Sequence, residues 1–248
     1  SMARDGMEIR LNTTVVGARR EGDMKILETV NNEVRGEVRA DEILVCVGRE
    51  ANVEELGLEA AGVAFDAKQG IAVDDFLCST NPNVYAAGDA CLSLKFTNAA
   101  QSSGRTAVKN ALMQGQQRQS GAIIPWCTYC DPEIAHIGLH VWEARRQSIP
   151  IKSFTVMMTD VDRAALDGQD TGFLKIHVSE GSDRILGATI VASRASELVN
   201  EMAVIMNAGI GMKALAEMVH TYPAQSEAIM LAAQAWRRDG RDCPAGVD

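Results

Sequence analysis

The sequence has little of what marks nucleic-acid-binding and membrane proteins. Positive charge is in deficit, with 24 Lys and Arg against 33 Asp and Glu, so the formal net charge is −9. A chain with this charge and no basic cluster is not expected to bind nucleic acid. Long apolar runs are also missing, because Glu42–Val47 and Met230–Trp236 fall far short of the ~20 residues that span a bilayer. With no apolar leader at its start, the sequence predicts a cytoplasmic protein without a membrane partner.

A glycine-rich turn for a dinucleotide is absent from the first part of the sequence. A dinucleotide-binding fold begins with a strand, a Gly-x-Gly-x-x-Gly turn and a helix, because the pyrophosphate needs close approach to the backbone. No such unit precedes residue 48. The Gly-x-Gly match at Gly209-Ile-Gly211 follows a helical pattern over Glu197–Met206 rather than a strand. We therefore expect a turn between two helices there.

The remaining composition is that of an ordinary globular protein. The chain has 248 residues, of which 46% are hydrophobic and 23% charged, enough for one large or two ordinary domains. Without a leader, an even number of cysteines does not indicate a disulfide framework, so most are expected to be small buried side chains. The six are Cys46, Cys78, Cys91, Cys127, Cys130 and Cys243.

Strands dominate the opening of the chain. The patterns over residues 8–18, 25–30 and 38–47 predict three strands, and the continuous apolar run Ile43–Val47 is typical of a buried one. Residues 54–61 predict a short helix that ends before Gly62.

The stretch from Thr80 to Asp89 is the most informative part of the first half. Val84–Ala87 is an apolar run between turn residues, so it predicts a buried strand that ends in Gly88-Asp89. Glycine lets a ligand approach the backbone, and an aspartate at a strand's carboxyl end accepts hydrogen bonds from ribose-like or ribitol hydroxyls. A small-residue helix follows over residues 99–113, and its N-terminal N–H groups would face the same ligand.

A polar linker over residues 114–121 separates a second half with a different order of elements. Strands are predicted over residues 124–129, 151–158, 172–178 and 185–191, and helices over 141–148, 195–208, 212–217 and 224–237. Strands grouped together with helices to one side predict an α+β layer domain.

Two of these stretches resemble one family. Thr80, Gly88-Asp89 and the helix after them resemble the second FAD motif of the class I pyridine nucleotide-disulfide oxidoreductases. Ile124-Pro-Trp-x-x-Tyr-x-Asp-Pro-Glu-Ile-Ala-His-Ile-Gly-Leu resembles the start of that family's dimerisation domain. The resemblance implies an FAD site that includes Gly88, Asp89, Phe96 and Thr97.

The same resemblance implies a fold class and a domain order. The fold would be α/β plus α+β, with remnants of the NAD(P)H- and FAD-binding domains followed by an α+β dimerisation domain. The expected limits are 1–64 for a partial NAD(P)H-binding domain, 65–118 for the C-terminal part of the FAD-binding domain, 119–240 for the dimerisation domain and 241–248 for a tail. Val45–Asn52 resembles the end of the NAD(P)H domain, where Gly-Arg-x-Pro-Asn is usual and Ala51 stands in the proline position. An ordinary strand exit explains these residues equally well.

The family's redox cysteine pair and first FAD motif have no counterpart in the sequence. The resemblance therefore implies the C-terminal part of an FAD-dependent NAD(P)H:disulfide or mercuric-type oxidoreductase. FAD and NAD(P)H would serve the intact enzyme, which passes a hydride to flavin and electrons onward. This chain alone is expected to bind neither cofactor and to be inactive. The alternative, from another class, is a non-catalytic dimerisation or interaction module.

A zinc site is a further alternative. Cys127-Thr-Tyr-Cys130 is followed by His136 and His140, which together could supply four tetrahedral ligands. The gap between the pairs is shorter than the ~12 residues usual in fingers. Cysteines three apart on an extended strand also point to opposite faces. A zinc-binding domain is therefore less favoured, and no metal ligands are expected.

The stretch Tyr222–Glu227 completes the resemblance. Pro223 marks a helix start, and Glu227 follows four residues later. In most of the family a histidine precedes this proline as the base toward the partner subunit's redox thiols, oriented by the glutamate. Tyr222 holds that place here, as in mercuric reductases, and the role is not moved to His220. The resemblance implies catalytic roles for Tyr222 and Glu227 on a mercuric-reductase-like branch, although the chain ends with the single Cys243 instead of paired cysteines.

The resemblance also implies a homodimer joined through the C-terminal domain around residues 222–227. Large apolar side chains appear in excess of what one small layered domain needs, and methionine adapts well to partner surfaces. These are Met202, Ile205, Met206, Met212, Met218, Ile229, Met230 and Leu231. Glu197 and Glu201, one helical turn apart, are expected on a solvated helix edge, and His177 at a surface or interface.

Overall fold

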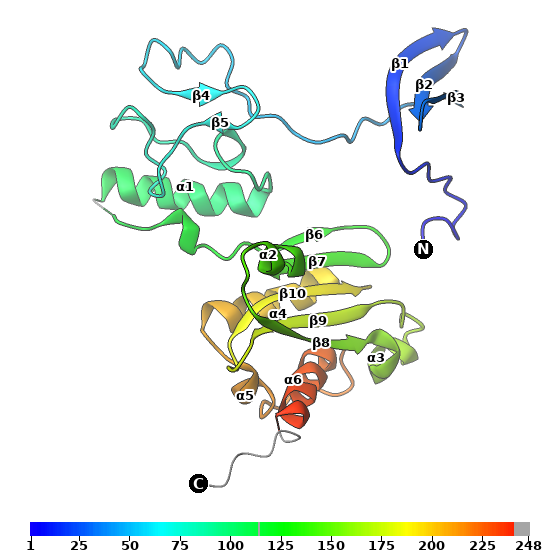
Figure 1. The fold of residues 1–248 in the computed structure, drawn as a ribbon, viewed down its shortest axis with the longest axis vertical. Coiled ribbons are helices and arrows are strands. Elements are labelled where there is room, and N and C mark those ends of the chain that lie inside the picture. Colours follow the sequence, from blue (N-terminus) through cyan, green and yellow to red (C-terminus); the bar gives the residue numbers. More distant parts are fainter. Residues whose placement is uncertain (114, 241–248) are drawn as a thin grey trace. The chain divides into compact units, whose positions relative to one another are not determined.

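The computed structural model describes residues 1–113 and 115–240. Its contacts divide the chain into two compact units, one of Ser1–Arg49 and one that begins at Glu50. Figure 1 shows the elements of each unit. The sequence analysis divided the chain into four segments, and those limits stay predictions.

The first unit is a three-stranded antiparallel sheet in which consecutive strands are neighbours. Its strands are β1 (Thr13–Glu21), β2 (Met24–Asn31) and β3 (Val34–Ala40), in the order β1-β2-β3. Arg19 of β1 reaches across the sheet, with its guanidinium 3.3 Å from Glu28 of β2 and 2.9 Å from Glu37 of β3. The first two strands predicted from the sequence are thus confirmed with shifted ends, and the third is confirmed only over residues 38–40.

The buried strand expected over Ile43–Val47 is wrong. Strand β3 ends at Ala40, and the side chains of Leu44 and Val47 are 88% and 92% exposed. A doubly buried strand needs hydrogen-bonded neighbours on both edges. None of the described strands pairs with this run, so its apolar composition does not lead to burial.

The second unit opens with loops around a small core. Two short strands, β4 (Phe65–Asp66) and β5 (Gly70–Ile71), pair with each other. The helix expected over residues 54–61 is wrong, because Glu55 and Gly57 have positive φ values of 58° and 66°, which helical residues do not adopt. The apolar side chains of this segment still pack together, and the buried members are Ala51, Val53, Leu58, Val63, Ile71 and Ala86.

The strand expected over Val84–Ala87 is reduced to a single bridge. Tyr85 pairs with Cys78, and the N–H of Ser79 donates to the carbonyl of Val84 at 2.9 Å. The segment leads into the 3₁₀ turn η1 (Gly88–Ala90) and then α1 (Thr97–Leu112), which confirms the predicted helix. One face of α1 is buried through small residues spaced three or four apart, namely Ala99, Ser103, Thr106, Ala107 and Asn110.

The rest of the second unit is built on a five-stranded antiparallel sheet (Figure 1). Its strands are β6 (Trp126–Thr128), β7 (Glu133–Gly138), β8 (Ile151–Met157), β9 (Phe173–Ser179) and β10 (Ile185–Ala192), in the order β6-β7-β10-β9-β8. The helices are α2 (Val141–Arg146), α3 (Asp162–Leu166), α4 (Ala195–Asn207), α5 (Met212–Leu215) and α6 (Glu227–Asp239). Strand β7 and helix α3 are the elements of this sheet domain that the sequence did not predict.

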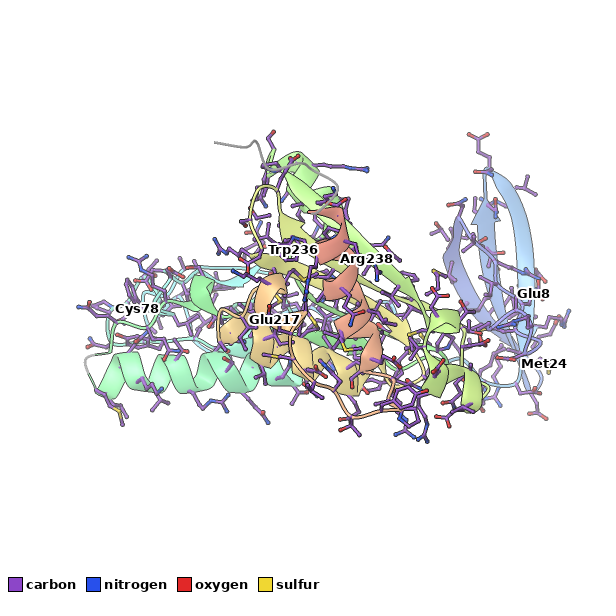
Figure 2. All side chains as sticks on the ribbon, turned by 90° about the horizontal axis from the view of Figure 1, so that it is seen from below. Glu8, Met24, Cys78, Glu217, Trp236 and Arg238 are labelled. Carbon is purple, nitrogen blue, oxygen red and sulfur yellow. The ribbon has the colours of Figure 1, made fainter. Side chains whose placement is uncertain are left out.

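One face of this sheet carries the core. The cross-strand partners Ile137, Ala188 and Ile176 are fully buried on this face. Helix α4 packs on β7 and β10, and α6 packs on β8 and β9. Trp236, near the end of α6 in Figure 2, packs against the same cluster. The α+β layer domain predicted from the sequence is confirmed.

The glycines after α4 form the helix–helix turn expected from the sequence. Gly209 has a φ of 68°, and the N–H of Ile210 donates to the carbonyl of Ile205 at 3.0 Å. Helix α5 then begins after Gly211. Among the described helices, none combines the length and the apolar composition that crossing a membrane requires.

Candidate functional site

The predicted cofactor residues lie where η1 meets the start of α1. Gly88 has a φ of 65°, and a Cβ atom placed on it would lie 2.8 Å from the Cβ of Ala100. The N–H of Gly88 donates to Oγ of the buried Ser103 at 2.9 Å. Only glycine combines this backbone conformation with such close packing. We call Gly88–Ala90 together with Phe96 and Thr97 the Gly88 corner.

The Gly88 corner presents groups suited to a polar ligand. The half-buried Asp89 is held through its backbone, because Nζ of Lys95 donates to its carbonyl oxygen at 2.8 Å. Phe96 stands at the N-cap position of α1 and offers no polar group to the first N–H groups of that helix. Burial raises the pKa of the neighbouring Cys91 to about 11, with Lys95 opposing the shift, so this thiol stays protonated.

Phe96 joins the Gly88 corner to the five-stranded sheet. Its ring lies parallel to that of Trp126 in β6, with centroids 6.2 Å apart and planes 4° from parallel. A cavity of about 430 Å³ opens beside them. Its walls come from the start of α1, from β6 and from α4, and include Phe96, Thr97, Asn98, Cys127, Tyr129 and Asn200. Two of the four predicted cofactor residues therefore line one hollow.

Tyr222 lies on the loop before α6 and is 67% exposed. Its hydroxyl donates a hydrogen bond of 2.6 Å to Oδ2 of Asp162. This bond and the negative charge of Asp162 raise the pKa of the Tyr222 phenol above its usual value, with smaller contributions from burial and Glu227. The tyrosine is thus held as a neutral hydrogen-bond donor. Nothing in the sequence connects these two residues, which lie sixty positions apart.

Glu227 and His220 lie on either side of this loop. The Oε2 atom of Glu227 is buried and has no hydrogen-bond partner among the described residues. Nε2 of His220 lies 2.8 Å from Oε1 of Glu201, whereas Nδ1 of His220 is buried without a described partner. The expectation that Glu201 lies on a solvated edge is met only in part. Its side chain stays 34% exposed, but the chain folds back after α5 and brings His220 onto α4 beside it. Glu197 is exposed as expected.

The residues of the alternative zinc site are mostly engaged elsewhere. Nδ1 of His136 lies 2.9 Å from Oγ1 of Thr189, and Nε2 lies 3.0 Å from the carbonyl oxygen of Gly138. The ring of His140 stacks on that of His136 at 3.4 Å. In residues 1–113 and 115–240, no group of three or more His, Cys, Asp or Glu side chains is arranged to hold a metal ion. This arrangement argues against a four-ligand zinc site.

Burial also changes the chemistry of two histidines. His136 and His177 are each 1% exposed, so the surface position expected for His177 is wrong. It lies on β9, an inner strand, and its Nδ1 is 2.8 Å from Oγ of Ser153. Burial lowers the pKa of both histidines to about 4, with further lowering from nearby His140. Both are neutral at pH 7.

Two family models match this chain. One, described as pyridine nucleotide-disulphide oxidoreductase, matches residues 1–115, and the other, described as the dimerisation domain of the same proteins, matches residues 124–233. The chain belongs to the pyridine nucleotide-disulphide oxidoreductase family. Within the family it lies on the mercuric-reductase-like branch, as the resemblance in its sequence implied.

Individual relatives agree with this assignment. The chain is 35% identical to a mercuric reductase from Acidithiobacillus ferrooxidans over 85% of this chain and 39% of that protein. It is 30% identical to a mercuric reductase from Shigella flexneri over 98% and 43% of the two chains. Mitochondrial dihydrolipoyl dehydrogenase from Mus musculus is also 30% identical, over 92% and 45%. The chain thus spans less than half the length of these three relatives.

Solved structures share the fold. LpdA from Mycobacterium tuberculosis superposes with a TM-score of 0.85 at 25% identity, over 95% of this chain and 50% of that one. The flavoprotein disulfide reductase RclA from Escherichia coli gives 0.82 at 24% identity, over 94% and 53%. The expected fold class, in which parts of nucleotide-binding domains precede a dimerisation domain, is confirmed for this chain.

The segment that resembles the end of the NAD(P)H-binding domain has no regular secondary structure. Val45–Asn52 forms no strand, and it crosses the division between the two units at Arg49. Cys243, which stands where mercuric reductases were expected to have paired cysteines, lies outside the described residues. Asp162 and Lys95 are the residues of interest that sequence reasoning missed, and the pairing of Glu201 with His220 was not expected. A carboxylate or ammonium group on a loop or helix carries no motif, so only the fold reveals these partners.

Proposed function

We propose that the protein containing this chain is an FAD-dependent oxidoreductase of disulfide or mercuric type that takes reducing equivalents from NAD(P)H. The observation that carries the proposal is the Gly88 corner, in which Gly88 packs without a Cβ atom against Ala100 of α1. It lies in the segment matched by the oxidoreductase model, and the dimerisation match follows it. Both halves of the family's C-terminal region are therefore represented in one chain.

The residues of the Gly88 corner fit part of FAD. The carboxylate of Asp89 can accept hydrogen bonds from a chain of hydroxyl groups, and the open N-terminal turn of α1 favours an electron-rich edge of the ligand. Phe96 and Thr97 would border the same ligand. FAD, when bound, accepts a hydride and passes electrons on. The chain's own contribution is to bind and orient one side of the cofactor.

We also propose that the chain forms a homodimer through its C-terminal domain. Four of the eight large apolar side chains that the sequence suggested for an interface lie instead in the domain's own core. They are Met202, Ile205, Met212 and Ile229. Exposed apolar side chains remain on α4 and on the segment that leads to Tyr222. They include Val204 at 67%, Met218 at 39% and Val219 at 97% exposure. Such side chains are unfavourable in water and suit a partner surface.

Within this proposal Tyr222 and Glu227 act across the dimer. The exposed phenol of Tyr222, fixed by Asp162, is available to a group outside its own chain. The buried Oε2 atom of Glu227 lacks a donor among the described residues, and a second subunit could supply one. Tyr222, whose own O–H is donated to Asp162, would then accept a hydrogen bond from substrate near the partner's flavin, and Glu227 would position the loop.

Light scattering tests the dimer directly. At micromolar concentration we expect about twice the mass of one 26.7 kDa chain. Val219→Asp should shift the population toward the monomer, because it would bury a charge in an apolar interface. Val108→Asp is the control, since Val108 is exposed on α1, outside the dimerisation domain. A wild-type mass of one chain would refute the dimer.

Absorbance spectroscopy tests the cofactor proposal. We expect this chain alone to be colourless, because its Gly88 corner meets only part of FAD. The longer protein that contains it should be yellow and should lose flavin when Asp89 is replaced by Ala. Stoichiometric flavin retained in the Asp89→Ala protein would contradict the role given to this residue.

A further inference from the structure

Two thiols point to the same carbonyl oxygen at the end of strand β6. Sγ of Cys127 donates to the carbonyl oxygen of Thr128 at 3.6 Å, and Sγ of Cys130 donates to the same oxygen at 3.7 Å. The carbonyl of Pro132 lies 3.1 Å from Sγ of Cys130. The sequence placed the two cysteines on opposite faces of one strand, but β6 ends at Thr128 and the chain bends at Cys130. The two sulfurs therefore share one acceptor.

The surroundings limit what these thiols can bind. The imidazole of His136 is committed at both nitrogens, to Thr189 and to Gly138. No third Cys, His, Asp or Glu of the described residues joins the two cysteines in a metal-binding arrangement. Zinc in structural sites takes four ligands, and calcium and magnesium take six or more oxygens. A pair of thiolates without other ligands instead suits a soft cation such as Cu(I).

The pair is accessible and lies near a negative charge. Cys127 lines the 430 Å³ cavity beside Phe96, and both cysteines are half-buried. Burial is the main cause that raises the pKa of Cys127, and the carboxylate of Glu133 and the nearby Cys130 add to it. Glu133 is itself held in place, because its Oε2 accepts the N–H of Ser196 at 2.8 Å. A fixed carboxylate near the Cys127 thiol favours the approach of a cation.

We propose that Cys127 and Cys130 form a two-thiol site for one soft monovalent cation of the Cu(I) class. On binding, each S–H bond breaks, two protons pass to solvent and two metal–sulfur bonds form, with no change in oxidation state. Each side chain has a single rotatable bond before its sulfur, so both thiols can turn from the Thr128 carbonyl toward a cation. The proposal does not depend on flavin or on the dimer.

Competition with a chromophoric Cu(I) chelator tests the site. The reduced chain is titrated without oxygen, and its tightest Cu(I) equivalent is measured for the wild type and for Cys127→Ser/Cys130→Ser. We expect the double variant to bind that equivalent about 100-fold more weakly or worse, because removing a ligand should cost more than the 10- to 100-fold typical of its supporting partners. Each single serine variant should lose it too, since the two sulfurs act together.

A matched variant separates the pair from the other cysteines. Cys46→Ser/Cys91→Ser removes two thiols that lie outside the dimerisation domain and should keep the wild-type affinity. Circular dichroism establishes that each variant is folded, and Cys127→Ala/Cys130→Ala repeats the test if the serines disturb the fold. The proposal is overturned if the folded double variants keep the tight equivalent, if either single variant keeps it, or if the control loses it.

Discussion

The phenol of Tyr222 donates a 2.6 Å hydrogen bond to the carboxylate of Asp162. Asp162 begins α3, and Tyr222 precedes α6, so the bond joins the start of one helix to the loop before another. Because the bond and the negative charge raise the pKa of Tyr222, Asp162→Asn should move it back toward the ordinary value near 10. Ultraviolet absorbance of the phenolate, followed between pH 8 and 12, measures the shift.

Tyr222→Phe identifies which of the three tyrosines responds. The phenolate transition that Asp162→Asn moves should be missing from the spectrum of Tyr222→Phe. If Asp162→Asn leaves all phenolate transitions unchanged, the hydrogen bond does not persist in solution.

Acid should destabilise the fold through His136 and His177. Their pKa values are about 4 in the folded chain and about 6.5 when unfolded, so the unfolded state binds more protons between these values. Stability is therefore full above pH 6.5 and falls as pH drops toward 4, by on the order of 3 kcal/mol for each histidine at the acid end. Urea unfolding at pH 7 and pH 5 measures the loss.

Carboxylates also contribute to acid unfolding, so the variant comparison decides the assignment. In His136→Gln/His177→Gln the amides can keep hydrogen bonds but bind no proton, and the loss between pH 7 and pH 5 should shrink. An unchanged pH dependence would mean that other groups cause it.

Gly88→Ala should destabilise the chain by about 1–3 kcal/mol, because the new Cβ meets Ala100 and the backbone keeps a positive φ. Gly104→Ala is the matched control within the same pair of elements. Nothing lies within 4 Å of a Cβ at Gly104, which is inside α1, so alanine should stabilise the helix by about 1 kcal/mol. Thermal unfolding that gives both variants the same sign would contradict the packing described at the Gly88 corner.

Glu227→Ala should loosen the loop around Tyr222 more than it changes the stability of the domain. Its Oε2 atom makes no hydrogen bond within the described chain, so removing it breaks no such contact inside one subunit. If the partner supplies a donor, the variant should raise the dimer dissociation constant by roughly tenfold. Sedimentation equilibrium measures that constant, with the exposed Glu217→Ala as control (Figure 2). Equal constants for the two variants would remove the cross-subunit role.

Periodicity in the sequence predicted most of the second half of the fold. Helix α4 and strand β9 were expected within one residue of their observed ends, because each buries one regular face against the shared core. Strand β7 was missed because it has six residues and begins directly after Pro132, where the turn residues indicate a loop. The prediction of a buried strand over Ile43–Val47 was wrong for a different reason. Its apolar composition indicates burial, but composition does not show which other segment would cover it.

The candidate site was predictable only where a motif fixes the backbone. Gly88 and Asp89 stand together with Phe96 and Thr97 as the sequence implied, because a glycine turn leading into a helix is a local arrangement. The bond of Tyr222 to Asp162, and that of His220 to Glu201, depend on how distant segments fold against each other. A single sequence contains no record of such long-range pairs.

The strand order of the five-stranded sheet constrains how the domain assembles during synthesis. Strands β6 and β7 form one hairpin and β8 and β9 another, yet β10, the last strand in the sequence, lies between them. Neither hairpin can join the other until Ile185–Ala192 has left the ribosome, and α4 and α6 cover the sheet only after that. The first hairpin is complete at Gly138 and stays without its β10 partner while residues 139–184 are made, which is the stage at which chaperones would be expected to bind the nascent domain.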